Sequence, residues 1–130
     1  MVAHLIERLP IARLRERPDF LRVASTRVRH ATPGLVLQMR EHTSQEREVG
    51  ELDTLRLGFT VSKKVGNAVV RNRVKRRLRA VAEAVLPIHA CGHRDLVIIG
   101  RQNALRRSFI ALQNDLEKAL KKLGAYEGSA

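Results

Sequence analysis

The sequence is poor in the residue types that mark several common classes of protein. Cys91 is its only cysteine, which excludes an intramolecular disulfide and is typical of a reducing compartment. There is no tryptophan and only 3% of the residues are aromatic, so platforms for stacking are few. No apolar run approaches the roughly 18 to 20 residues that span a bilayer, and the N-terminus lacks a signal peptide's continuous apolar stretch. We therefore expect a soluble, cytoplasmic protein with no membrane partner.

Groups suited to catalysis or metal binding are also sparse. Residues 54–82 contain no Asp or Glu, the five His are scattered, and no Ser, His and Asp arrangement is discernible. His89, Cys91 and His93 are close together, but without a distant fourth ligand their spacing matches no standard zinc site. Other histidines, such as His42, are most simply turn or surface residues. We expect neither catalytic residues nor a metal site on the protein.

What the chain has in excess is positive charge. It carries 25 Lys and Arg against 13 Asp and Glu, for a formal net charge of +12, and nine of the bases lie in residues 54–82. Like charges four residues apart destabilise a helix, and surfaces that serve only solubility usually interleave both signs. This clustering of positive charge therefore indicates a surface that binds a polyanion, and nucleic acid is the first partner to consider.

The length of 130 residues and the 44% hydrophobic content fit one domain with one core, residues 1–130. Within it we expect three segments outside the packed elements: an extended basic arm, a solvated loop and a tail, at residues 1–17, 41–53 and 124–130.

Hydrophobic periodicity predicts the remaining elements. Alternation and short apolar runs favour strands at residues 28–31, 35–40, 55–61 and 96–99. Spacings of three and four favour helices that begin near Pro18, run over residues 67–85, and run over residues 109–123. Asn67 should cap the long helix and Pro87 should lie just past its end. The order α-β-β-β-α-β-α predicts an α/β (α+β) two-layer sandwich.

The run GFTVSKKVGNAVVRNRVKRRLR, residues 58–79, resembles the signature of the bacterial ribonuclease P protein subunit. The flanks agree with the family in Arg13-Leu14, in Asp19-Phe20 and in the buried strand 95–99, so the resemblance covers about residues 8–123. It implies an α-β-β-β-α-β-α sandwich shared with a ribosomal protein domain. It also implies a left-handed β-α-β crossover around the basic helix, against the usual right-handed rule.

The resemblance implies an accessory, RNA-binding subunit of a ribonucleoprotein endonuclease. In this family a large catalytic RNA hydrolyses the phosphodiester that joins the 5′ leader to the tRNA in precursor tRNA. The required Mg²⁺ would be bound mainly by that RNA and the substrate. The partners would be the catalytic RNA and precursor tRNA, with no protein partner required.

Two surfaces are implied by position. The first, set against the catalytic RNA, falls on Lys63, Lys64, Asn67, Arg71, Asn72, Arg73, Lys75, Arg76 and Arg79. The second, a cleft between the first helix and the sheet that holds the leader, falls on Arg13, Phe20, Val36, Gln38, Phe59 and Val61. Ala24 and Gln38 stand where the best-known members have aromatic residues, so leader binding should depend less on stacking.

Two other functions compete with this interpretation. A structural binder of ribosomal RNA would share the fold class and the charge, but would give no reason for the Gly-Asn-Ala and Arg-Asn-Arg spacing of residues 66–73. A DNA-binding regulator would need a compact helix-turn-helix, whereas the basic helix here is expected to follow a strand and a four-residue loop, residues 63–66.

Overall fold

The computed structural model describes residues 9–49 and 54–127. The strands are β1 (Ile11–Arg13), β2 (Arg29–Ala31), β3 (Leu35–Glu41), β4 (Leu55–Thr60) and β5 (Arg94–Gly100). The helices are α1 (Arg17–Ser25), α2 (Ser44–Val49), α3 (Ala68–His89), the short 3₁₀ helix η2 (Gln102–Leu105) and α4 (Phe109–Lys122). The strands form one mixed sheet in the order β1-β4-β5-β3-β2, in which β1, β4 and β5 are parallel and β3 is antiparallel to both of its neighbours.

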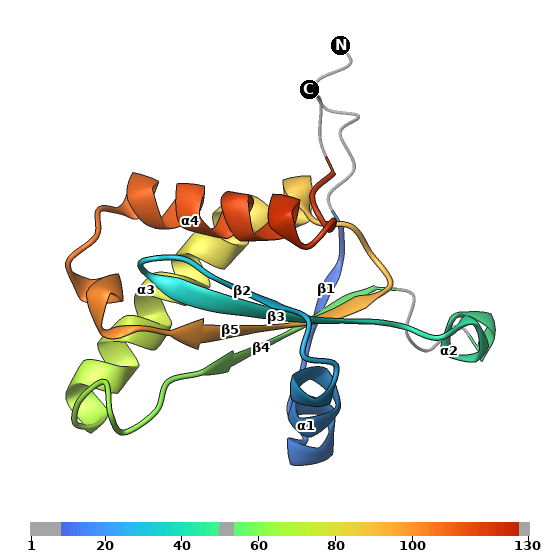
Figure 1. The fold of residues 1–130 in the computed structure, drawn as a ribbon, viewed down its shortest axis with the longest axis horizontal. Helices are drawn as coiled ribbons and strands as arrows, with labels where there is room; N and C mark the ends of the chain where they lie inside the picture. The colour runs from blue at the N-terminus through green and yellow to red at the C-terminus, as the bar shows by residue number, and fades with distance from the viewer. Residues whose placement is uncertain (1–8, 50–53, 128–130) are drawn as a thin grey trace, which may run out of the picture.

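Helices cover both faces of the sheet (Figure 1). Because side chains alternate along a strand, Leu57 and Leu96 point into the large core under α3 and α4, while Val97 and Ile99 point to the opposite face. There they meet Val23 of α1. The α/β class is confirmed, and the two faces give the molecule two surfaces of different character.

The sheet has one strand more than the periodicity predicts. Residues 11–13, expected within an extended arm, pair with β4 as the edge strand β1, and the Leu14 amide donates to the Leu57 carbonyl at 2.9 Å. Three residues are too few for a period of two to be recognised, so the free edge of β4 decides this pairing. Residues 1–8 of the expected arm lie outside the described residues.

The solvated loop expected at residues 41–53 contains a helix, α2. Thr43 Oγ1 accepts from the Glu46 amide at 3.1 Å, and Glu46 Oε1 accepts from the Thr43 amide at 2.8 Å. This reciprocal pair is a capping box, and the Thr-x-x-Glu spacing is the sequence signal that the loop interpretation missed. Residues 50–53 lie outside the described residues.

The long helix begins where the sequence predicts and ends later. The Asn67 side chain accepts from the Val70 amide at 3.0 Å, which confirms the cap. However, α3 continues past Val85, with Pro87 inside its last turn. Proline removes one backbone donor there, and burial of Leu86, which is 0% exposed, offsets the loss.

The tail expected at residues 124–130 packs against the domain as far as residue 127. Gly124 has φ 73° and closes α4, in the left-handed conformation that suits glycine. Ala125 is fully buried and its carbonyl accepts from the Cys91 amide at 2.9 Å. The Tyr126 ring stacks on His89, with centroids 4.9 Å apart. Residues 128–130 lie outside the described residues. In the described part of the chain, no helix is long and apolar enough to cross a bilayer.

Candidate nucleic-acid interface

The rotation of α3 about its axis is set by its apolar stripe. Val74, Leu78 and Val81 are 0% exposed and Val85 is 2% exposed, so the spacing of three and four predicted from the sequence is the buried face. Because these residues occupy the side that faces the sheet, the Lys and Arg side chains between them must point outward.

We call the predicted RNA-contact set the basic face. Its exposed members are Lys63, Lys64, Asn67, Asn72, Arg73, Arg76 and Arg79, and its half-buried members are Arg71 and Lys75. Among residues 9–49 and 54–127, none of these cations forms an ion pair. The structure thus brings the set together on one helix and its preceding loop, with the positive charge left unneutralised by described acids.

Arg77, which is not in the predicted set, has a structural partner. Its guanidinium donates to the Arg107 carbonyl, and Arg107 in turn donates to the Asp115 carboxylate at 2.6 and 2.9 Å. This chain of contacts ties α3 to the segment before α4 and to α4 itself. Arg77 is therefore held by the fold, in contrast to its neighbour Arg76.

A pocket of about 370 Å³, which we call the edge pocket, lies at the end of β1, where the chain no longer pairs with β4. It joins residues of both sheet faces and of α3: Arg13, Leu14, Arg15, Phe20, Leu57, Gly58, Phe59, Lys75 and Arg79. Four cations and two aromatic rings around one hollow can hold a phosphate beside a base.

Gly58 allows α1 to approach the sheet at this pocket. A Cβ atom built on Gly58 would lie 2.5 Å from the Phe20 ring and 3.1 Å from Leu14 Cβ. No side chain larger than hydrogen fits without displacing the ring. The glycine therefore determines where Phe20 lies.

The six residues predicted to hold the leader are not on one face. Val36 and Gln38 pair with Ile99 and Val97, on the face that α1 covers. Phe59 and Val61 instead pack with the core under α3, as does the neighbouring Leu57.

The period of two explains this division. Arg13 pairs with Leu57 and so shares the α3 face, and the residues of β4 on the α1 face are Arg56, Gly58 and Thr60. Arg13, Phe20 and Phe59 nevertheless meet in the edge pocket, whereas Val61 contacts neither it nor α1 in any described interaction. The roles of all six stay predictions.

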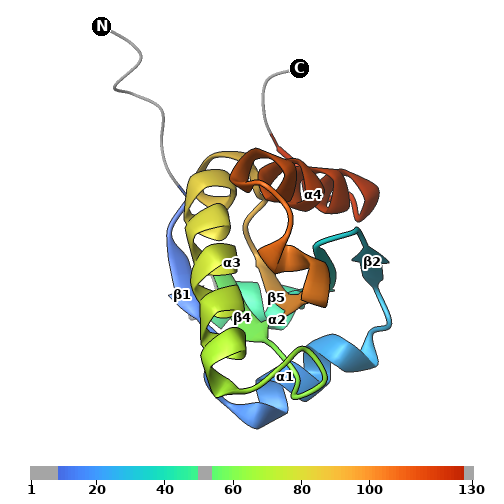
Figure 2. The ribbon, with the colours of Figure 1, turned by 90° about the vertical axis from the view of Figure 1, so that its left-hand side faces the viewer.

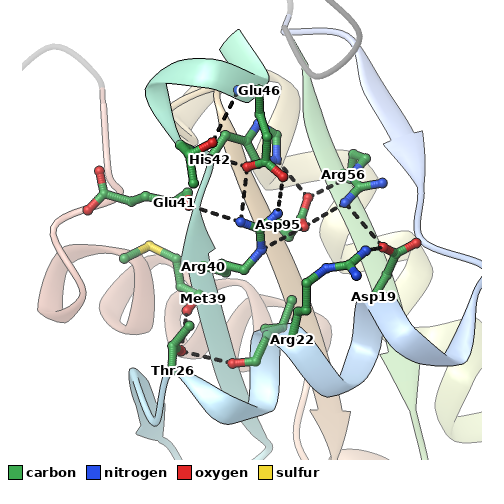
Figure 3. A network of polar contacts seen from close by, with 12 residues as sticks. Asp19, Arg22, Thr26, Met39, Arg40, Glu41, His42, Glu46, Arg56 and Asp95 are labelled. Carbon is green, nitrogen blue, oxygen red and sulfur yellow. Dashed lines mark hydrogen bonds and ion pairs between the residues drawn. The ribbon is translucent and has the colours of Figure 1, made fainter.

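A buried polar network, which the sequence interpretation missed, lies on the α1 face at the start of β5 (Figure 3). Asp95 is 0% exposed and accepts two hydrogen bonds of 2.7 Å from Arg56. His42, expected at the surface, is buried with its Nε2 atom 2.8 Å from Asp95. Arg40 lies 3.5 Å from Asp95 and is also paired with Glu46 of α2 at 2.8 Å.

The network fixes the ionisation of its acids and the position of α1. Burial alone would raise the pKa of Asp95, but hydrogen bonds from Arg56 and His42 outweigh burial and hold that pKa below its usual range. The hydrogen bond from Arg40 lowers the pKa of Glu46 to about 2. Arg56 also lies 3.7 Å from Asp19 at the start of α1, so Asp95 is linked to that helix through one guanidinium.

The described residues do not offer a protein site for Mg²⁺. No three His, Cys, Asp or Glu side chains among them are grouped as a metal site. The buried acids among them, Asp19, Asp95 and Asp115, are all paired with arginines. A carboxylate already paired with a guanidinium is a poor ligand for a hard cation, so this arrangement does not fit a Mg²⁺ site.

The longest helix of this α/β fold carries Lys and Arg side chains without acidic partners among the described residues, beside a pocket with two aromatic rings. This arrangement is that of a nucleic-acid-binding protein. Comparison with known proteins specifies the family. The family model described as Ribonuclease P matches residues 10–124. The ribonuclease P protein component of Paramagnetospirillum magneticum is 49% identical over 115 residues, which cover 88% of this chain and 84% of that protein.

Solved structures agree with this assignment. The RNase P protein of Staphylococcus aureus is 32% identical with a TM-score of 0.68, covering 88% of this chain and 97% of that one. The RNase P protein of Thermotoga maritima is 27% identical with a TM-score of 0.68, covering 85% and 96%. The chain therefore belongs to the ribonuclease P protein family. Its members are the RNA-binding protein components of a ribonucleoprotein that acts as an endoribonuclease in tRNA processing.

Proposed function

We propose that this protein binds the catalytic RNA of ribonuclease P and the 5′ leader of precursor tRNA, and that the RNA performs the hydrolysis. The observation that carries the proposal is the basic face of α3, whose cations lack acidic partners among the described residues. Phosphates supply the missing negative charge, and each contact releases counterions from the RNA. The place of action we propose is the cytoplasm, which follows from the substrate.

We assign the two RNAs to adjacent parts of the surface, which meet at Lys75 and Arg79. The basic face, from Lys63 to Arg79, lies against the catalytic RNA. The leader lies in the edge pocket and continues over the α1 face, where Arg13 and Phe20 contact its phosphates and bases. Val36 and Gln38 extend this path along β3. Phe59 contributes through the edge pocket, and Val61 supports the strand from within the core.

In this arrangement the protein supports the use of Mg²⁺ without holding the ion. Catalytic RNA and substrate are both polyanions and repel each other, and Mg²⁺ screens that repulsion as well as serving the chemistry. Cations on α3 and around the edge pocket reduce the repulsion directly. We therefore expect the protein to lower the Mg²⁺ concentration needed for processing, most strongly for substrates that carry a leader.

The test is processing of a precursor tRNA at low Mg²⁺ by the cognate catalytic RNA alone, by this protein alone, and by both together. Strong stimulation by the protein, with no cleavage by the protein alone, supports the proposal. Absence of stimulation would favour a structural binder of ribosomal RNA, and cleavage by the protein alone would overturn the assignment of catalysis to RNA. A substrate without a leader serves as the matched control, because it retains the tRNA body but removes the proposed protein contact.

A further inference from the structure

A second hollow lies on the α3 side of the edge strand β1. This groove has a volume of about 520 Å³, within the range of small-ligand sites. It is lined by Leu9, Pro10, Ile11, Ala12, Arg13, Leu57, Phe59, Arg79, Ala82, Glu83 and Pro87. Figure 2 shows β1 running beside α3 along one side of the molecule, where these residues meet. We call it the β1–α3 groove.

The groove is continuous with the edge pocket. Arg13, Leu57, Phe59 and Arg79 line both hollows. A strand of nucleic acid in the edge pocket therefore has a path around the end of β1, from the α1 face to the α3 face. The two cations of the groove, Arg13 and Arg79, belong to this shared part, and the residues that line the groove alone are apolar except for Glu83.

The groove combines three chemical features. Leu9, Ile11 and Phe59 are partly buried apolar side chains packed on the core, so its wall is rigid. The Arg79 guanidinium lies 5.7 Å from the centre of the Phe59 ring. Glu83 is the only acid of α3, it is exposed, and none of its interactions within the described chain is an ion pair.

We propose that the β1–α3 groove binds one unpaired base of the leader, beyond the nucleotides that contact Phe20. This inference rests on the proposed function. The base lies against Phe59 and the apolar wall, and its flanking phosphates contact Arg13 and Arg79. Glu83 accepts a hydrogen bond from an N–H group of the base. Charge complementarity favours this occupant over an apolar peptide, which would leave the two arginines without anionic partners.

Glu83 gives the β1–α3 groove a preference among nucleobases. Guanine presents two adjacent donors on its Watson–Crick edge, whereas uracil presents one donor between two carbonyl acceptors that a carboxylate repels. A glutamate therefore favours guanine and disfavours uracil. At this leader position we expect guanine to bind more tightly than uracil.

The test is a scan of the leader with single abasic nucleotides, measured as the Kd of precursor tRNA for the holoenzyme with Ca²⁺ in place of Mg²⁺ to suppress cleavage. The wild-type protein and the Phe59→Leu variant are compared, since leucine keeps the apolar packing but removes the ring. We expect one leader position at which loss of the base weakens wild-type binding about tenfold and leaves the variant unchanged. That position lies further from the cleavage site than those sensitive to Phe20→Ala. Identical abasic profiles for wild type and Phe59→Leu would overturn the proposal.

Two further measurements identify the occupant. Glu83→Gln should reduce the preference for guanine over uracil at that position, whereas Lys118→Gln, an exposed change on α4, should not. If Phe59→Leu weakens binding to the catalytic RNA alone and leaves the leader profile intact, the occupant belongs to the catalytic RNA and the proposal is wrong. If neither Phe20→Ala nor a leaderless substrate changes affinity, the proposed function itself fails. Circular dichroism of each variant establishes that it is folded before affinities are compared.

Discussion

Replacing Asp95 with Asn removes the charge at the centre of the buried network while preserving the shape of the side chain. Removing one partner of a buried ion pair costs about 3–5 kcal/mol, because the other charge is left uncompensated. Here the side chains of Arg40 and Arg56 retain 11% and 17% of their exposure, and asparagine keeps one acceptor oxygen. We therefore expect the lower end of the range, about 3 kcal/mol of unfolding free energy at pH 7.

This loss is large enough to measure by thermal unfolding. An unfolding entropy of about 2.1 cal/mol/K per residue gives about 0.3 kcal/mol/K for a chain of this length. Dividing the loss of about 3 kcal/mol by this entropy, we expect the midpoint temperature of unfolding to fall by about 10 °C. Circular dichroism of the free protein supplies the measurement. Glu48→Gln is the matched control, because this exposed acid of α2 belongs to no ion pair among the described residues.

The pH dependence gives the same prediction an independent check. The pKa of Asp95 is lowered in the folded state, so its contribution is fully present above the unfolded-state pKa of about 3.9 and is lost as the pH falls through the folded-state value. The unfolding free energies of wild type and Asp95→Asn should therefore differ most near neutral pH and converge below about pH 4. A difference under about 1 kcal/mol at pH 7, or one that grows in acid, would show that Asp95 does not hold the two arginines in this way.

Three other outcomes are expected. Replacing Arg71 and Arg73 with Ala should weaken binding to the catalytic RNA and flatten the dependence of log K on log salt by about 0.7–0.9 per lost phosphate contact; an unchanged slope would place the RNA elsewhere. Leu78→Ala should lower the unfolding free energy by about 2–5 kcal/mol in denaturant titration, because the side chain is 0% exposed. Gly58→Ala should displace Phe20 and reduce leader affinity with a stability loss of about 1–3 kcal/mol, and full retention of leader affinity would exclude Phe20 from that contact.

The elements that sequence patterns predict well are those whose signals are local and long. On α3, the spacing of three and four predicted the buried face of Val74, Leu78, Val81 and Val85, and Asn67 predicted the helix start. The run at residues 96–99 gave β5, because its continuous apolar character matches a strand buried on both faces. The basic face followed from the same periodicity, since the residues between the apolar positions must point outward.

The capping box of α2 was a local signal that was overlooked, whereas β1 and the buried polar network depend on pairing between distant segments. No local sequence pattern at Ile11–Arg13 predicts that these residues pair with the free edge of β4. His42 and Asp95 are 53 positions apart, and each alone fits an ordinary surface residue; only the register of β3 against β5 brings them together. The division of the predicted leader residues between two faces was accessible in principle, because Phe59 and Val61 share the parity of Leu57.

The uneven distribution of acidic residues over the molecule gives it an electric dipole. Asp19, Glu46, Asp95 and Asp115 are occupied by arginines of the sheet, α1 and the loop before α4, so none of these four acids offsets the positive charge of α3. Such a body experiences a torque in the field of a polyanion, as well as an attraction. Diffusing toward a folded RNA, the protein should turn its long helix to the front before contact, so that a larger share of encounters begins in a productive orientation. Added salt should slow association chiefly by removing this alignment.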